Sequence, residues 1–301
     1  MRSQPGEHAP EIAFALDYLL SSGGKRIRVA VTLLVGLMFK ADSQKLITLA
    51  GAIELLHTAT LVHDDLIDNS LFRRGIPTLN AKWTPAATVL TGDFIFARAA
   101  ELSADVESVR LMKLFAQTLE IIVNGEITQM LGRCSNASRE SYERRIYAKT
   151  ASLFESAATS AAVLANQDET IVQRLGSYGR SIGMAFQIMD DVLDYTGEQE
   201  TVGKPVASDL RQGLITLPVL LYLDRHADDA EIKLILEGKR LNEAQMQRLL
   251  ASIRQSGAIE QAVGEAEKYI ESAIEQLTIF PATPERLSLE SLARYIVQRR
   301  K

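Results

Sequence analysis

Hydrophobic residues recur along most of this chain at the spacing of amphipathic α-helices. The apolar positions lie among Ala, Leu, Glu and Gln, which favour helix, and strand-like alternation of apolar and polar residues is almost absent. The longest uncharged apolar run, 29–39, indicates a buried helix and is too short to span a bilayer. The pattern therefore predicts an all-α fold, a helical bundle around a central cavity.

Breaks in this pattern give the expected boundaries of the helices. Gly, Pro and polar residues gather in 21–24, 73–85 and 196–212, which we predict to be loops. Helices are expected at residues 10–20, 25–39, 43–68, 87–104, 107–131, 138–166, 169–195, 218–225, 242–256, 258–280 and 284–298. No change of composition marks a linker and no tandem repeat is present, so residues 1–301 are expected to form a single domain.

The composition narrows the compartment and the partners. The 301 residues are 47% hydrophobic and 24% charged, which is ordinary for a globular protein. The single cysteine, Cys134, excludes a disulfide framework, and the polar first residues do not resemble a signal peptide. The net charge of -5 argues against a nucleic-acid surface. We expect a cytoplasmic protein with no nucleic-acid partner and no transmembrane segment.

Two acidic clusters share the pattern D-D-x-x-D, at 64–68 and at 190–194. On a helix, Asp64 and Asp68 point the same way, with Asp65 about 100° round the axis. Such close carboxylates repel unless a counter-ion is present, and magnesium typically takes one or two carboxylates together with substrate phosphates. A solvated acidic helix end would explain one such cluster. Two clusters favour a pair of carboxylate walls that face one metal-diphosphate.

Basic side chains stand near both clusters in two groups. One group can hold a diphosphate without metal: Lys25, Arg28, His57 and Arg74. Lys25 and Arg28 follow a glycine pair at an expected helix start, His57 lies two turns before Asp64, and the fork of Arg74 fits phosphate oxygens. The other can help the metals to hold a second diphosphate: Arg73, Lys149 and Lys204. For each residue alone, a solvated surface position, or a core position for His57, is the plainer explanation.

Two uncharged polar side chains complete the second wall. Gln187 shares a helix face with Asp190 and Asp194, and Thr150 follows Lys149. The helices below both acidic clusters are apolar, so the cavity floor should be hydrophobic. A substrate with a diphosphate head and a hydrocarbon tail fits such a site.

These residues resemble the trans-polyprenyl diphosphate synthase family over nearly the whole chain. The motifs that carry the resemblance occur in the family's order: Gly23-Gly24-Lys25-Arg26-x-Arg28, both D-D-x-x-D clusters, Arg73-Arg74-Gly75, Gly92-Asp93, Lys149-Thr150, Phe186-Gln187, Gly203-Lys204 and Thr216-Leu217-Pro218. One position departs from the pattern, because Leu214 stands where many members have lysine. No diphosphate contact is assigned to that position.

The resemblance implies the isoprenoid synthase fold and a 1'-4, all-trans condensation of isopentenyl diphosphate with an allylic diphosphate. Two or three Mg²⁺ ions would bind Asp64, Asp68 and Asp190, with Asp65, Asp191 and Asp194 in support. The allylic diphosphate would contact Arg73, Lys149, Thr150, Gln187 and Lys204. Isopentenyl diphosphate would contact Lys25, Arg28, His57 and Arg74. Because the family is commonly homodimeric, a homodimer is expected, and the product would allow peripheral membrane contact.

The length of the product should depend on residues below the first acidic cluster. Neither Ala59 nor Thr60 is bulky, and Leu56 lies deeper on the same helix. Each unobstructed turn of about 5.4 Å leaves room for roughly one more isoprene unit. We expect a medium- or long-chain product for a quinone tail, of about six to ten units by similarity to the heptaprenyl and octaprenyl types.

Three alternatives stay open on the sequence. A bulky residue from another helix could limit the product to geranylgeranyl length. A class I terpene cyclase ionises a diphosphate in a similar cavity, although it would not require the basic group around Lys25. A non-catalytic subunit of a heteromeric synthase usually lacks one of the motifs that are intact here.

Overall fold

The computed structural model describes residues 10–21, 23–131, 138–196 and 206–298. The first half of the chain contains α1 (Pro10–Ser21), α2 (Ile27–Met38), α3 (Ser43–Ile67), β1 (Phe72–Arg73), β2 (Ile76–Pro77), α4 (Leu79–Lys82), α5 (Pro85–Asp105) and α6 (Val109–Leu131). The second half contains α7 (Arg139–Ile146), the π-helical turn η1 (Tyr147–Ala151), α8 (Ser152–Leu164), α9 (Glu169–Thr196), α11 (Ser208–Arg211), α12 (Leu217–Leu223), α13 (Ala230–Leu236), α14 (Glu243–Gln255), α15 (Ala258–Leu277) and α16 (Pro284–Gln298). The all-α prediction is confirmed, because the sheet in these residues is one hairpin of two-residue strands.

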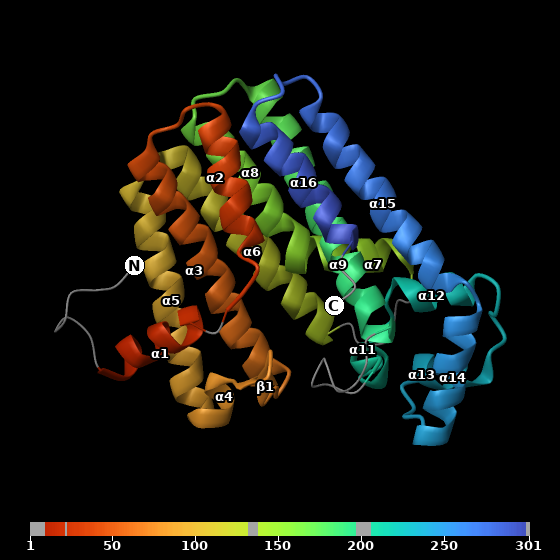
Figure 1. Ribbon diagram of the computed structural model, residues 1–301. Helices are drawn as coiled ribbons and strands as arrows, with labels where there is room; N and C mark the ends of the chain where they lie inside the picture. Colours follow the sequence, from red (N-terminus) through yellow and green to blue (C-terminus); the bar gives the residue numbers. More distant parts are fainter. Residues whose placement is uncertain (1–9, 22, 132–137, 197–205, 299–301) are drawn as a thin grey trace.

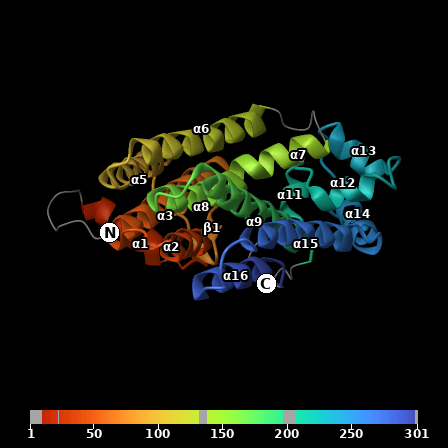
Figure 2. The ribbon, with the colours of Figure 1, turned by 90° about the horizontal axis from the view of Figure 1, so that it is seen from above.

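The long helices lie in three layers. Figure 2 shows α5 and α6 along one side, α3, α8 and α9 in the middle, and α2, α15 and α16 on the other side. Contacts are most extensive where α3 meets α5 and where α9 meets α8 and α15. In Figure 1 the C-terminal ends of α3 and α9 point to the same side of the bundle, with the hairpin beside one and α11 beside the other. The layers thus bring together the two chain segments that carry the acidic clusters.

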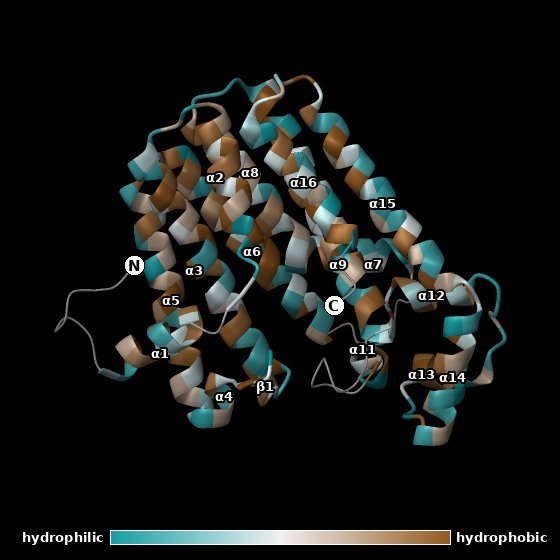
Figure 3. Cartoon of the chain, in the orientation of Figure 1, coloured by the Kyte–Doolittle hydropathy of each residue, from teal (hydrophilic) through white to brown (hydrophobic). Residues whose placement is uncertain are grey.

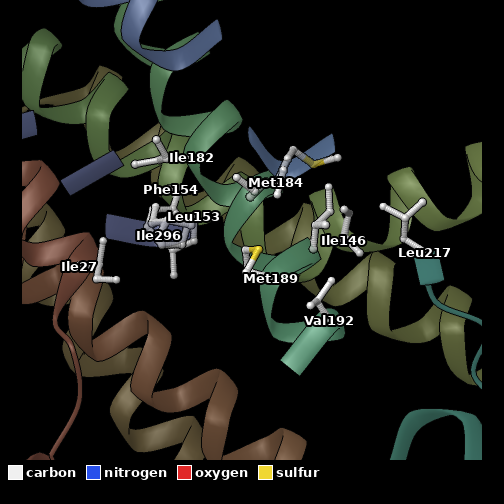
Figure 4. Packing of buried hydrophobic residues seen from close by; sticks show 14 of the residues in the cluster. Ile27, Ile146, Leu153, Phe154, Ile182, Met184, Met189, Val192, Leu217 and Ile296 are labelled. Atoms are coloured by element: carbon white, nitrogen blue, oxygen red, sulfur yellow. The ribbon is translucent and has the colours of Figure 1, made fainter. Parts of the chain in front are cut away.

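Helix α9 is the centre of the hydrophobic core. Figure 4 shows its buried side chains, Ile182 and Met189 among them, between side chains of α2, α8 and α16. The backbones of η1 and α9 approach closely, since a Cβ on Gly183 would lie 2.5 Å from the Cα of Ala151, the last residue of η1. Only glycine permits that approach, and it sets the distance between the wall that carries Asp190 and the neighbouring helix.

Helix α3 is the one described helix that is long and apolar enough to cross a membrane. However, 67% of its most apolar window is buried inside the protein, as expected of a core helix. Asp42 caps its start, because its side chain accepts a hydrogen bond from the backbone N–H of Lys45. Figure 3 shows brown, hydrophobic residues along α3 and teal residues at the end near β1. The helix therefore carries the first acidic cluster from an apolar interior to a polar opening.

The structure differs from the predicted elements in four places. The loop predicted at 73–85 contains part of the hairpin and α4, and the loop at 196–212 contains α11. The helix predicted over 138–166 is interrupted by η1, and no helix was expected at α13. The missed elements are too short to show a periodic pattern. The hairpin turn, Arg74-Gly75, has positive φ at both residues, a conformation for which asparagine is the usual signal before glycine.

Candidate active site

Both acidic helix ends open into one cavity of about 640 Å³. Most of the predicted site residues line it: Lys25, Arg28, His57, Thr60, Asp64, Asp65, Asp68, Arg73, Arg74, Lys149, Thr150, Gln187 and Asp190. Asp191, Asp194, Leu56 and Ala59 are not among the lining residues. Lys204 lies outside the described residues. The cavity therefore brings together segments that are far apart in the sequence, such as those that contain Lys25 and Asp190.

The first acidic cluster is tied to the hairpin. The Nε of Arg73 donates to both carboxylate oxygens of Asp65, at 2.9 and 3.0 Å, and its Nη2 lies 2.8 Å from Oδ1. Two-pronged contacts of this kind fix the direction of an arginine side chain. Arg73 is thus held at the cavity by the middle carboxylate, while Asp64 and Asp68 face the same cavity.

Lys149 lies over the first cluster although it belongs to η1. Its Nζ lies 3.0 Å from a carboxylate oxygen of Glu126, on α6, and 4.0 Å from Oδ2 of Asp64. Burial acts to lower the pKa of Lys149, but the nearby carboxylates of Asp64 and Glu126 raise it above its usual value, so the side chain is charged. Sequence reasoning missed Glu126, because nothing in the spacing of α6 marks it.

Burial and neighbouring carboxylates disfavour the charged form of Asp64. Burial raises its pKa to about 6; the positive charge of Lys149 opposes this rise, and the carboxylates of Glu126 and Asp68 add to it. A divalent cation would relieve this cost by stabilising the charged form. No three described His, Cys, Asp or Glu side chains form a preformed metal cluster. Asp64, Asp68 and Asp190 line one cavity, and magnesium takes one or two carboxylates and completes its shell with phosphate oxygens and water.

The second acidic cluster is built into the scaffold. Asp191 is buried and accepts hydrogen bonds from the hydroxyl of Tyr142, at 2.7 Å, and from Nε2 of Gln187, at 2.9 Å. The hydroxyl of Thr150 donates to Oε1 of Gln187 at 2.6 Å. Burial raises the pKa of Asp191 to about 7, although both hydrogen bonds act to lower it. Sequence reasoning found Thr150 and Gln187 but missed Tyr142, which lies on α7 across η1.

Asp194 binds backbone rather than lining the cavity. Its two carboxylate oxygens accept from the N–H groups of Ser208 and Asp209, at 3.1 and 3.2 Å. Its carbonyl oxygen accepts from the N–H of Ala207 at 2.8 Å. Ala207 has a positive φ of 55°, and the hydrogen bonds fix this turn ahead of α11. Asp194 therefore supports the second wall by anchoring the segment that returns to it.

Arg28 and His57, two residues of the basic group, contact each other. A guanidinium nitrogen of Arg28 lies 3.1 Å from Nε2 of His57, and its guanidinium stacks 4.4 Å from the ring of Phe154. Burial lowers the pKa of Arg28 to about 10, so it is still a cation at neutral pH. Burial, helped by the charge of Arg28, lowers the pKa of His57 well below its usual value, so this imidazole is neutral.

The rest of the basic group is organised by contacts that the sequence did not reveal. Arg26 forms an ion pair with the buried Glu54 and also donates to the carbonyl oxygen of Leu20 at 2.8 Å. Arg74 donates to the carbonyl oxygen of Gly23 at 2.6 Å. These contacts close the glycine loop onto α3 and the hairpin. No spacing rule marks Glu54, which lies among apolar residues of α3.

The residues expected to limit product length differ in position. Thr60 lines the cavity, whereas Ala59 and Leu56 are fully buried in the hydrophobic core.

The motif residue Asp93 contacts a histidine of α3: Nε2 of His63 lies 3.4 Å from its carboxylate. A Cβ on Gly92 would lie 2.2 Å from that imidazole. The pair Gly92-Asp93 thus seats His63, on α3, against α5.

Comparisons with known proteins agree with this geometry. Residues 9–253 match the family described as Polyprenyl synthetase. The heptaprenyl diphosphate synthase component 2 of Geobacillus stearothermophilus is 38% identical over 299 residues, 99% of this chain and 92% of that protein. The octaprenyl diphosphate synthase of Escherichia coli (strain K12) is 37% identical over 289 residues, 94% of this chain and 88% of that protein.

Solved structures share the fold over the whole chain. A polyprenyl synthase from Caulobacter crescentus CB15, complexed with calcium and isoprenyl diphosphate, is similar with a TM-score of 0.90 and 36% identity. The match covers 100% of this chain and 92% of that one. The two acidic helix ends, the basic residues between them and these similarities lead to one conclusion: the chain belongs to the polyprenyl synthetase family, a family of prenyltransferases.

Proposed function

We propose that this enzyme condenses isopentenyl diphosphate with an allylic diphosphate, head to tail and all-trans, to make a medium- or long-chain polyprenyl diphosphate. The observation that carries the proposal is the single cavity in which two acidic helix ends face two sets of basic residues. One set lies beside the carboxylates and the other on the glycine loop and hairpin. Two diphosphate heads thus have separate places above a shared apolar floor. The relatives named for heptaprenyl and octaprenyl products support the chain-length class.

The allylic diphosphate would lie between the two acidic walls. Asp64, Asp68 and Asp190 have the oxygen ligands and the cavity position to hold two or three Mg²⁺ ions. Bound there, the metal supplies Lewis-acid stabilisation of the leaving diphosphate. Lys149 and Arg73 add positive charge at the same wall, and Lys204 is proposed to do so from its loop. The charge that these side chains stabilise develops as the carbon–oxygen bond breaks, so they favour the transition state.

Isopentenyl diphosphate would bind to Lys25, Arg28, His57 and Arg74. Arg28 lines the cavity and stays a cation at neutral pH, so its guanidinium is placed to attract an anion. The neutral imidazole of His57 can donate one hydrogen bond without adding charge. These residues would orient the double bond of the second substrate toward the allylic carbon.

The cavity floor would keep water from the allylic cation. Phe154 and Phe186 line the cavity below the charged residues, with ring centroids 5.5 Å apart. Apolar lining matters because water would quench the cation before the double bond attacks it. The proton lost after bond formation would pass to the departed diphosphate, which remains beside Lys149.

The assay that tests the function uses purified protein with radiolabelled isopentenyl diphosphate, farnesyl diphosphate and Mg²⁺. A ladder of extended products that ends at about six to ten isoprene units is expected, by similarity to the relatives named for heptaprenyl and octaprenyl products. A product that stops at four units would favour the geranylgeranyl alternative. A cyclic hydrocarbon from the allylic substrate alone would favour a terpene cyclase.

Thr60 is the position at which chain length can be changed with least damage. It lines the cavity, so Thr60→Phe should shorten the product while the protein stays folded. Ala59→Phe is the contrasting variant: Ala59 is fully buried, and added volume there should cost about 1–3 kcal/mol of stability. Reversed-phase chromatography of the products and thermal unfolding together separate the two effects. Unchanged product length in Thr60→Phe would exclude this wall of the cavity.

We propose that the protein is a cytoplasmic homodimer that reaches membranes only peripherally, to release its product. One face of α6 carries Val123, Ile127 and Met130, spaced as on a single helix face and each 44–49% exposed. A second copy would cover this face. Light scattering should then give twice the chain mass, and Ile127→Glu should lower it. Because one relative is named component 2, an inactive protein that gains activity with a different subunit is the alternative outcome.

A further inference from the structure

We propose that Glu126 is a positioning residue of the metal-diphosphate site. Its carboxylate holds the ammonium group of Lys149 away from Asp64 and so leaves the Asp64 carboxylate available to a divalent cation. The inference rests on the proposed function, because it takes Asp64 to be a metal ligand. Glu126 belongs to neither acidic cluster and lies on a different helix, α6.

The distances show which carboxylate holds the lysine. Nζ of Lys149 lies 3.0 Å from Oε1 of Glu126 but 4.0 Å from Oδ2 of Asp64. The Glu126 and Asp64 side chains are both 15% exposed, so water screens this arrangement only in part. One cation between two carboxylates leaves the set with a net negative charge. Without the charge of Glu126 the lysine would neutralise Asp64, and the attraction for a cation would fall.

The backbone is shaped to allow this contact. A Cβ on Gly125 would lie 2.5 Å from the Cβ of Ala148, the residue before Lys149. Glycine at this position therefore lets α6 approach η1 closely enough for Glu126 to reach the lysine. The lysine itself sits in a π-helical turn, an irregularity that is frequent at functional sites.

A purely structural ion pair explains these features less well. Pairs with a partly exposed partner add little to folding stability, and the Lys149 side chain is 34% exposed. The effect on local charge is larger, because the removed charge lies beside a proposed cation ligand. The two explanations predict different results: a structural pair changes the unfolding temperature, whereas a positioning residue changes cation binding at nearly constant stability.

The experiment measures Mg²⁺ binding by isothermal titration calorimetry with inorganic diphosphate at saturating concentration. Glu126→Gln should raise the Mg²⁺ concentration at half-saturation about three- to tenfold, because the site loses one negative charge. Glu126→Asp keeps the charge and should restore most of the affinity. Glu120→Gln removes an exposed charge from the same helix and should behave as wild type.

The outcomes separate this inference from the proposed function. If Asp64→Asn raises the half-saturation concentration and Glu126→Gln does not, the role of Glu126 is overturned while the metal site stands. If Asp64→Asn has no effect, the metal assignment fails, and both proposals with it. If Glu126→Gln does not fold, Glu126→Asp and Glu126→Ala decide: equal affinity in both would overturn the inference. A fall in unfolding temperature without a change in affinity would also overturn it.

Discussion

The two acidic clusters have the same pattern but are supported in different ways. At the first, the middle carboxylate, Asp65, binds Arg73 from a hairpin outside the helical layers. At the second, the middle carboxylate, Asp191, is buried and bound by Tyr142 and Gln187 from the packed helices. The first wall is thus held by a surface element and the second by the core. The second should keep its shape without ligand, whereas the first depends on the hairpin.

The outer carboxylates differ as well. Asp64 and Asp68 both line the cavity, but at the second cluster only Asp190 does, because Asp194 binds the backbone before α11. Under the proposed function, Asp64, Asp68 and Asp190 would meet a cation, whereas the other three aspartates bind protein groups. A repeated motif does not imply repeated roles for its residues.

The largest expected effect comes from the carboxylates that face the cavity. Asp64→Asn and Asp190→Asn should each lower kcat at least about 100-fold, because each removes charge from the proposed metal site. Steady-state assays at saturating substrate, at several Mg²⁺ concentrations, measure the effect. The variants should fold normally. A loss below tenfold in either would show that its wall does not hold the metal.

A pH effect distinguishes the buried middle carboxylate. The pKa of Asp191 is raised from 3.8 to about 7 in the folded protein, so the folded state holds a proton that the unfolded chain releases between these pH values. As pH rises from about 4 to 7, the free energy of unfolding should fall by at most about 1.4 kcal/mol per pH unit. Urea denaturation at several pH values, without Mg²⁺, measures this dependence. The free energy of unfolding should fall less steeply with pH in Asp191→Asn than in the wild type. Equal slopes would contradict the assignment.

The glycine contacts behind the two walls give the next effect. A methyl group at Gly183 would strike the backbone of Ala151 at the end of η1, which cannot move aside, so Gly183→Ala should cost about 1–3 kcal/mol and much of the activity. A methyl group at Gly92 would strike the imidazole of His63, which can rotate, so Gly92→Ala should cost less. Gly264→Ala is the control, because open space surrounds that position. Thermal unfolding measures the stability of each variant. An equal loss of stability in Gly183→Ala and Gly92→Ala would contradict the proposed difference between the two walls.

The smallest effect should follow from the outer carboxylate that binds backbone. Asp194→Ala leaves two N–H groups without their acceptor and should cost about 1 kcal/mol, with a modest loss of activity. Asp68→Ala should do the reverse, lowering activity with little change in stability, because Asp68 lines the cavity. Measuring both the free energy of unfolding and kcat for the two variants tests this contrast. A stability loss in Asp68→Ala larger than in Asp194→Ala would contradict it.

Most of this arrangement could be predicted from periodicity and from charged residues in a repeated pattern. Long helices show their apolar face over many turns, and Asp64 and Asp190 are marked by their own clusters. Glu54, Glu126 and Tyr142 were missed because each acts across a tertiary contact. A single carboxylate on an apolar helix has no local signal, and its partner becomes visible only when the helices are packed. The short elements were missed for the related reason that one or two turns contain no period.

The π-helical turn before α8 has a consequence for insertions and deletions. Each residue of a regular helix turns the chain by about 100°, so the irregular turn changes the phase of everything before it relative to everything after. Tyr142 reaches Asp191 on one side of the turn, while Thr150, within it, reaches Gln187. Deleting one residue here would turn the side chains on one side of the deletion by about 100° relative to those on the other side, although each would keep its chemistry. For this segment, the number of residues matters as much as their identity does.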